Sequence, residues 1–258
     1  MNNSISFEGA VNELTSLMNS ISIEYDKLRV ETQVESFKDW SLFGDIDELL
    51  AWYARQKSAC TMLVSDIPLG ECRGWFLDKD SGHIVHTSGD FFKVQGVRIE
   101  NSSGREVSSG WDQPIITQIG FDGGLLGLLR KRFSGVPHYL IEAKAEPGNP
   151  DLVQISPTLQ ATFSNLRRAH QGRKPHFAEY FEAPEDCESE ILFSQWMSED
   201  GGRLHLKRNK GMLVEVGEHA TLPAFPDTFR WVSLYQLKHL IKSNSWVNPH
   251  IRGILSHL

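Results

Sequence analysis

The stretch HYLIEAKAEPGNPDLVQISPTLQATFS, residues 138–164, decides the fold. Residues 139–146 alternate between apolar and charged side chains, as a strand with one buried face does. The sequence EPGNP at residues 146–150 follows, and such a run of breaker residues is typical of a specific turn. Residues 153–164 then alternate again, with apolar side chains at odd positions and amides or hydroxyls at even ones. The stretch therefore predicts two strands joined by a turn.

A helix is the alternative for residues 153–164, because Ile155, Leu159 and Phe163 also lie four residues apart. We favour a strand with Pro157 at a sheet edge or a bulge, since proline has no N–H to donate to a central ladder. Gln160 and Ser164 share a face in either case.

Helical patterns lie on both sides of this region. Asp45 and Glu48 have capping-box spacing ahead of an apolar face, and a final helix is expected from about Ser233. Residues 123–132 fit either a short helix or a buried strand, and the polar residues 171–190 predict a loop. Short β-prone runs bounded by turn residues predict further strands at Thr61–Val64, Gly74–Leu77, His83–Thr87, Phe91–Ile99, Ile115–Ile119, Ile191–Met197, Leu204–Lys207 and Met212–Val216. The pattern indicates an α+β domain with a mainly antiparallel or mixed sheet and flanking helices.

The first thirty residues have a helical pattern of their own. Apolar side chains recur at spacings of four and three at Phe7, Val11, Leu14, Met18, Ile21, Tyr25 and Leu28. Such a helix packs either on the core of its own domain or against a second subunit. We therefore expect an N-terminal helical extension over residues 1–40 and one domain over residues 41–258.

The composition excludes several classes of protein. Hydrophobic residues make up 40% of the 258, which is enough for a core without a metal or disulfide staple. The net charge is −7 with scattered Lys and Arg, which disfavours nucleic acid as a partner. The three cysteines have no metal-ligand spacing. With no signal-peptide pattern and no apolar run of membrane-spanning length, we expect a cytoplasmic protein that does not enter the membrane.

Charged and polar side chains of the 138–164 stretch are candidates for chemistry. Lys144 lies between Glu142 and Glu146 on one strand face, where an ammonium stabilises negative charge beside a general base. An ordinary solvated ladder of ion pairs is the alternative. Residues 152–165 carry no charge, and their row of amides and hydroxyls suits a polyhydroxylated ligand or, alternatively, a structural polar surface.

Basic residues follow this stretch in two places. Arg167, Arg168 and His170 come directly after it, and the arginine fork suits a diphosphate, although a solvated helix end has the same composition. Later, the sequence SEDGG at residues 198–202 precedes KRN at residues 207–209, but spacing does not show that these segments meet the first one. Dinucleotide, P-loop, nucleophile-elbow and zinc-protease motifs are missing, and the histidines have no metal-ligand spacing.

Several of these segments resemble the NDP-hexose 2,3-dehydratase family from about residue 40 to the C-terminus. The EPGN turn and the run SPT-x-QAT-x-SN are the most specific of them. The matching segments are Ser88–Phe92, Trp111–Ile116, Gly124–Gly127, Ala143–Asn149, Val153–Thr162, Ser164–Asn165, Arg168, His170, Phe229–Trp231, Val247–Asn248 and Arg252.

The resemblance implies a Nudix-like mixed-sheet domain and a reaction in deoxysugar biosynthesis that uses neither metal nor cofactor. Members usually hold two such domains, so a chain with one is expected to pair as a homodimer. The expected reaction removes the C2 hydroxyl from an NDP-4-keto-6-deoxyhexose, such as dTDP-4-keto-6-deoxy-D-glucose. It proceeds through C3 proton abstraction and an enolate.

The resemblance also suggests roles for individual residues. Lys144 is the candidate for enolate stabilisation, and Glu146 or His170 for proton transfer. Arg168 and Lys207 are candidates for the diphosphate. The other candidates for binding the nucleotide sugar are His86, Gln113, Asn149, Gln154, Ser156, Gln160, Ser164, Asn165, Glu199 and Asn209.

The sequence departs from the family pattern around residues 196–211, where Glu199 and Asn209 match but their neighbours do not. This leaves two alternatives to the dehydratase. One is a catalytically silent subunit that binds nucleotide sugar or partners an active dehydratase. The other is an isomerase or epimerase acting on similar substrates.

Overall fold

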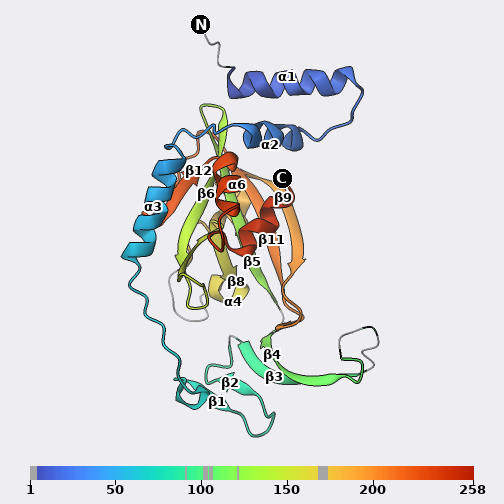
Figure 1. Ribbon diagram of the computed structural model, residues 1–258, viewed down its shortest axis with the longest axis vertical. Helices are drawn as coiled ribbons and strands as arrows, with labels where there is room; N and C mark the ends of the chain where they lie inside the picture. The colour runs from blue at the N-terminus through green and yellow to red at the C-terminus, as the bar shows by residue number, and fades with distance from the viewer. Residues whose placement is uncertain (1–4, 91, 101–103, 105–106, 121, 168–173) are drawn as a thin grey trace.

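The computed structural model describes residues 5–90, 92–100, 104, 107–120, 122–167 and 174–258. Two β-sheets and a set of helices form the molecule (Figure 1). The large sheet occupies the middle of the molecule, the small sheet lies at one end, and the N-terminal helices lie at the other. The expected α+β class with mixed sheets is confirmed.

The large sheet is built around the 138–164 stretch. Its strand order is β12-β6-β5-β11-β9, with β7 paired to β6 and β8 paired to β5. β5 runs antiparallel to β6 and parallel to β11, which makes the sheet mixed. Its strands are β5 (Gly124–Phe133), β6 (Val136–Ala145), β7 (Val153–Ser156), β8 (Leu159–Thr162), β9 (Ser189–Ser198), β11 (Arg208–Val216) and β12 (Phe229–Val232).

The alternating stretch after the turn forms strands and then a helix. β7 and β8 are separated at Pro157 and Thr158, so the proline lies at a break between two strands and not at an edge or bulge of one strand. The helix α4 (Phe163–Leu166) begins immediately after β8, where the side chain of Thr162 caps it. The strand interpretation is therefore correct up to Thr162 and wrong for the last two residues of the run.

The small sheet has the order β1-β2-β3-β4-β10, and β10 pairs parallel to β4. Two neighbouring side chains of its first strand, Phe76 and Leu77, are 48% and 63% exposed. Its strands are β1 (Trp75–Leu77), β2 (Ile84–His86), β3 (Phe92–Ile99), β4 (Trp111–Gln118) and β10 (Leu204–His205). The strand expected at Thr61–Val64 is wrong, because this segment has no regular structure and Leu63 is 97% exposed.

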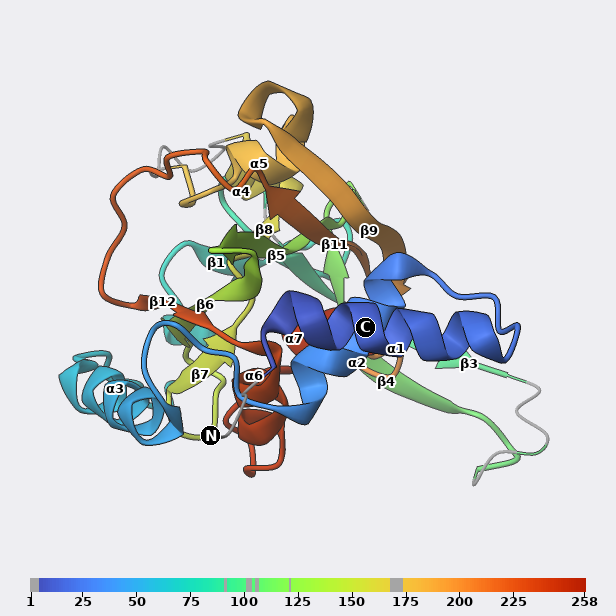
Figure 2. The ribbon, with the colours of Figure 1, turned by 90° about the horizontal axis from the view of Figure 1, so that it is seen from above.

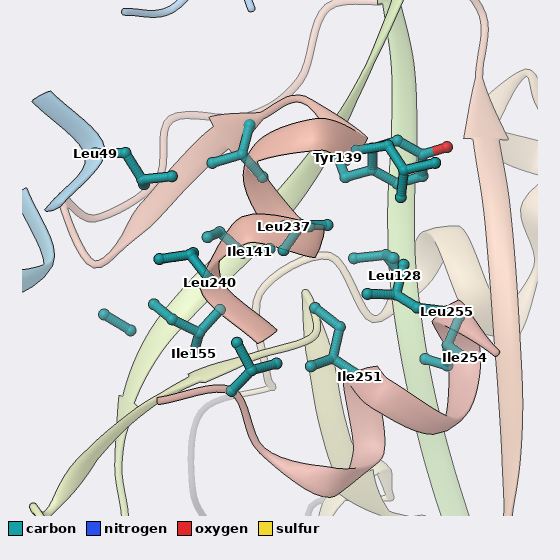
Figure 3. Close-up of a cluster of buried hydrophobic side chains, with 14 of the residues drawn as sticks. Leu49, Leu128, Tyr139, Ile141, Ile155, Leu237, Leu240, Ile251, Ile254 and Leu255 are labelled. Atoms are coloured by element: carbon teal, nitrogen blue, oxygen red, sulfur yellow. The ribbon is translucent and has the colours of Figure 1, made fainter. Parts of the chain in front are cut away.

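Helices cover the large sheet and bury its apolar side chains. Leu237 and Leu240 of α6 (Leu234–Ile241) and Ile251 of α7 (Pro249–Leu255) pack toward strand residues such as Ile141 and Ile155 (Figure 3). α3 (Ile46–Ala59) adds Leu49, Trp52 and Tyr53 to the same core. The capping box expected from Asp45 to Glu48 forms, and a second one, which was not expected, joins Ser233 and Gln236 at the start of α6.

A second core lies around residues 177–181. Phe177, Tyr180 and Phe181 are buried, and the last two belong to the short helix α5 (Glu179–Glu182). Gly127 of β5 permits this packing, because a Cβ there would lie 2.4 Å from the ring of Phe181. The loop expected over residues 171–190 is therefore wrong for this part, where three aromatic anchors override the polar composition.

The N-terminal residues form two helices instead of the single helix expected. α1 (Phe7–Ser20) ends before Ser22, whose φ of +54° lies in the left-handed region, and α2 (Lys27–Phe37) starts at the Asp26 cap. The heptad pattern continues across this turn, so it could not reveal the break. Seen from above, α1 lies across α2 (Figure 2).

Candidate active site

A cavity of about 760 Å³ opens where the large and small sheets meet. Its wall contains side chains of both signs of charge, together with amides and a few apolar groups. The lining residues are Phe92, Leu126, Glu146, Gly148, Gln160, Ala161, Thr162, Asn165, Glu199, Arg203, Leu204, Lys207, Asn209, Pro249 and His250. A cavity of this size and polarity suits a small polar ligand.

Glycine at position 124 lets two walls of the cavity approach each other. Gly124 pairs with Thr162 of β8 and lies beside β11. A Cβ at this position would lie 2.5 Å from the carbonyl oxygen of Ala161 and 3.1 Å from Oδ1 of Asn209. A side chain here would push Asn209 or β8 out of place.

A chain of amides joins β8, the turn after β6 and α7. Gln160 Nε2 donates to Glu146 Oε1 at 3.0 Å, and Gln160 Oε1 accepts from Asn248 Nδ2 at 3.0 Å. Asn248 Nδ2 also donates to Ser156 Oγ at 2.9 Å, while its Oδ1 caps α7 by accepting from Ile251 N. These bonds fix the Glu146 carboxylate relative to the start of α7.

Three further polar side chains of the cavity lining meet at Glu199. Asn209 Nδ2 donates to Glu199 Oε1, and His250 Nδ1 lies 3.6 Å from the same oxygen. The backbone supports this arrangement, because Glu199 N donates to the carbonyl oxygen of Lys207 at 3.0 Å. Glu199 thus brings an amide and an imidazole together at the cavity.

Lys207 lines the cavity and belongs to a further polar network. Its Nζ donates to Gln118 Oε1, and Gln118 Nε2 donates to Asp122 Oδ1 at 2.6 Å and to the carbonyl of Gly123 at 2.9 Å. Burial lowers the pKa of Lys207, against the opposing influence of Glu199 and Asp122. The ammonium is therefore incompletely compensated and suited to an anionic ligand.

Lys144 lies behind the cavity wall. Its Nζ donates to the carbonyl oxygen of Gln160 at 3.1 Å, and the cavity lining does not include it. The pKa of the neighbouring Glu142 is raised, mainly because the carboxyl is buried. The charge of Glu146 raises this pKa further, and the charge of Lys144 opposes the increase. The charged face of β6 is thus enclosed and linked to β8, rather than an open, solvated ladder.

Sequence comparison identifies the relatives of this chain. A family model described as NDP-hexose 2,3-dehydratase matches residues 46–258. The chain belongs to the NDP-hexose 2,3-dehydratase family. A dTDP-4-dehydro-6-deoxy-alpha-D-glucopyranose 2,3-dehydratase from Amycolatopsis orientalis is 37% identical over 215 residues, which cover 82% of this chain and 44% of that protein. Its counterpart from Streptomyces violaceoruber is 38% identical over 211 residues, covering 81% of this chain and 45% of that one. The chain thus spans about half the length of these relatives.

Solved structures match at a lower level. A Nudix hydrolase from M. Smegmatis has a TM-score of 0.31 and 15% identity, with 58% of this chain and 92% of that one covered. An ADP compounds hydrolase has a TM-score of 0.35 and 12% identity, with 64% and 83% covered. Scores this low add no argument to the α+β class that the sheets themselves establish.

Six of the residues expected from the family resemblance line the cavity. They come from the turn after β6, from β8, from α4, from the segment after β9 and from β11. These residues are Glu146, Gln160, Asn165, Glu199, Lys207 and Asn209. The segments at residues 146–165 and 199–209, which spacing could not connect, therefore meet in one place.

Other expected residues lie outside the cavity lining. His86 and Gln113 belong to the small sheet, where Gln113 Nε2 donates to the carbonyl of Gly202 at 2.8 Å. Asn149 donates to the carbonyl of Leu152 within the turn. Their contact with a ligand stays a prediction.

Three more expected residues have internal partners, and two lie outside the described structure. Gln154 donates to the carbonyl of Ser245, and Ser164 Oγ lies 2.9 Å from Thr162 Oγ1. Ser156, as described above, accepts from Asn248. Arg168 and His170 lie outside the residues that the structure describes.

The sequence did not single out His250, Arg203 or Phe92 as site residues, yet all three line the cavity. Asn248 lay within a matching segment without a role, and the structure makes it the amide that links Ser156 and Gln160. Nothing in the local sequence distinguishes His250 from the other histidines. Its position follows from the packing of α7 against β11 and β5, with Asn248 at the start of the helix bonded to Ile155 of β7.

The residues that the structure describes hold no group of three or more His, Cys, Asp or Glu side chains placed to bind a metal ion. Likewise, none of the helices within the described ranges has the length and apolarity to cross a membrane.

Proposed function

We propose that this chain eliminates the C2 hydroxyl of an NDP-4-keto-6-deoxyhexose, with dTDP-4-keto-6-deoxy-D-glucose as substrate. The main support is that residues of the matching segments, which come from separate strands and turns, line one polar cavity of about 760 Å³. The names of the relatives, dTDP-4-dehydro-6-deoxy-alpha-D-glucopyranose 2,3-dehydratases, support the choice of substrate.

The proposed reaction uses the C4 ketone of the substrate. The ketone acidifies the C3 hydrogen, so a base takes this proton and the electron pair forms an enolate. The enolate then collapses to the ketone as a C2–C3 double bond forms and the C2–O bond breaks. The hydroxyl leaves as water after gaining a proton, and the remaining enol becomes a 3,4-diketone.

Glu146 is the proposed base, because its carboxylate lines the cavity and is held by Gln160. Lys207 is the proposed partner of the diphosphate, together with Arg168. Lys144 contributes positive charge from behind Gln160. Positive charge next to a developing enolate is an effective source of rate enhancement in an enclosed site.

The test is a coupled assay. The purified chain is incubated with dTDP-4-keto-6-deoxy-D-glucose, a 3-ketoreductase and its reduced nicotinamide cofactor, and the product is analysed by mass spectrometry. We expect a 2-deoxy sugar nucleotide. Failure to form it at any concentration of the chain contradicts the proposal, and calorimetric binding of the nucleotide sugar without turnover favours the silent subunit instead.

We further propose that two copies of the chain associate and that they work in the cytoplasm. Apolar side chains stay exposed on α1 and on the small sheet, including Leu17 and Ile21 at 58% and Leu77 at 63%. The three cysteines are free, which fits a reducing compartment. Sedimentation equilibrium should give a dimer, and Leu17→Glu with Leu77→Glu should weaken it; a monomer at high concentration contradicts this proposal.

A further inference from the structure

Elimination needs an acid for the leaving hydroxyl as well as a base for the C3 proton. Glu146 supplies one such group on one wall of the cavity. His250 lies in the same cavity and is the only histidine, among those the structure describes, that lines it. We infer that His250 is the general acid that protonates the departing C2 hydroxyl, with Glu199 as its positioning residue. This inference rests on the proposed dehydratase function.

The first support is the pairing of imidazole and carboxylate. His250 Nδ1 lies 3.6 Å from Glu199 Oε1, and the two side chains are 22% and 20% exposed. Within the described part of the chain, His250 Nε2 has no hydrogen-bond partner. A carboxylate at one ring nitrogen orients the ring and leaves the other nitrogen to exchange a proton with substrate.

The second support is that hydrogen bonds from neighbouring residues hold both His250 and Glu199 in position. Asn209 is buried, and its Nδ2 donates to the same oxygen of Glu199. His250 follows Asn248 and Pro249, and Asn248 is bonded through its backbone N to the carbonyl of Ile155 at 2.9 Å. The ring is therefore held by a docked helix and not by a free loop, as a catalytic group requires.

The third support is the amide chain across the cavity. Asn248 bonds Gln160, and Gln160 bonds Glu146, so the two proton-transfer groups are set by one continuous network. A base and an acid that line one cavity and are linked by this network match an elimination in which the proton leaves C3 and the hydroxyl leaves C2.

The proposed proton transfers balance without any other reagent. Glu146 takes the C3 proton and becomes a carboxylic acid, while protonated His250 gives its proton to the C2 hydroxyl as the C2–O bond breaks. Water leaves, and the enzyme holds neutral His250 and protonated Glu146. Transfer of one proton from Glu146 to His250 through solvent restores the starting state.

The test separates the two proton transfers. His250→Gln should lower kcat by about 10²- to 10⁴-fold with little change in KM, because a general acid acts in the transition state. In D₂O the variant should still exchange the C3 hydrogen for deuterium, since Glu146 is intact. Imidazole added to His250→Ala should restore part of the turnover.

Three comparisons control this test. His239→Ala removes an exposed histidine of α6 and should keep wild-type turnover. Glu199→Gln should lower kcat less than His250→Gln does, and in the His250→Gln background it should add almost no further loss, because its effect passes through the ring. Thermal melts of His250→Gln and His250→Asn report whether the variants stay folded.

The outcomes distinguish this inference from the proposed function. If the unsubstituted chain gives no dehydrated product, both fail. If the unsubstituted chain turns over and a folded His250→Gln variant does so equally well, the acid assignment alone fails. Loss of C3 exchange together with turnover in a folded His250→Gln variant also overturns it, because His250 would then act at the first step.

Discussion

Strands β5 and β11 carry polar clusters at both ends, and the two clusters differ in how they are closed. At the α2 end, Arg130 is 1% exposed and donates to Glu31, Glu35 and Glu215. At the cavity end, Gly124 and Asn209 adjoin side chains that face open space. The first group, Arg130 with its three carboxylates, is called here the Arg130 cluster.

The difference separates a structural site from a functional one. In the Arg130 cluster one guanidinium bonds all three carboxylates, and the side chains of Arg130 and Glu35 are only 1% and 2% exposed. The polar side chains at the other end of these strands line a cavity of about 760 Å³. Buried charge that pairs internally positions helices, whereas charge left at a cavity is available to a ligand.

The largest expected effect tests the cavity end. Glu146→Gln keeps the hydrogen bond partner for Gln160 but removes the proposed base. We expect kcat to fall by about 10²- to 10⁴-fold with nearly unchanged thermal stability. C3 exchange in D₂O should disappear with it. The matched variant Glu190→Gln, on the exposed edge strand β9, should behave as wild type; equal activity of both variants would remove Glu146 from the mechanism.

The second prediction tests the opposite end. Arg130→Met should lower the free energy of unfolding by about 3–5 kcal/mol, because it leaves buried carboxylates without a partner. Urea denaturation measures this. Arg132→Met is the control: Arg132 contacts Glu31 and Glu215 too, but its side chain is 25% exposed, so the loss should be clearly smaller. Similar losses for both variants would show that burial does not set the contribution of Arg130.

The sequence predicted individual strands and helices better than it predicted the contacts between them. Strand alternation, the Asp45–Glu48 capping spacing and helical periodicity are local signals, so residues 139–146 and the helices from Asp45 and Ser233 were predicted correctly. The Arg130 cluster joins α2 to β5 and β11, and no local pattern connects residues so far apart. His250 was missed for the same reason, because its partner Glu199 meets it only through tertiary packing.

The third prediction concerns the close approach of strands at the cavity. Gly124→Ala places a methyl group 2.5 Å from a backbone oxygen, which strands β8 and β5 cannot accommodate without shifting. A loss of about 1–3 kcal/mol in unfolding free energy is expected, with weaker nucleotide-sugar binding. Gly148→Ala is the control, since this glycine also lines the cavity but its Cβ would meet nothing within 4 Å. Equal stability of the two variants would refute the packing role.

The smallest effect concerns the pH dependence of anion binding. Burial lowers the pKa of Lys207, so its ammonium loses its proton at a lower pH than an exposed lysine does. Because the folded chain binds this proton less tightly than the unfolded chain does, the free energy of unfolding is reduced at pH values below the lowered pKa. The reduction becomes smaller as the pH rises toward the ordinary value of 10.5. Binding of thymidine diphosphate should show the opposite trend: it is strongest below the lowered pKa and weakens by about tenfold above it, a change of about 1.4 kcal/mol. Calorimetry across the alkaline range measures this, with Lys207→Arg as the control because a guanidinium stays charged. If the unsubstituted chain and the Lys207→Arg variant lose affinity at the same pH, Lys207 does not bind the diphosphate. Another cation at the cavity must then take that role.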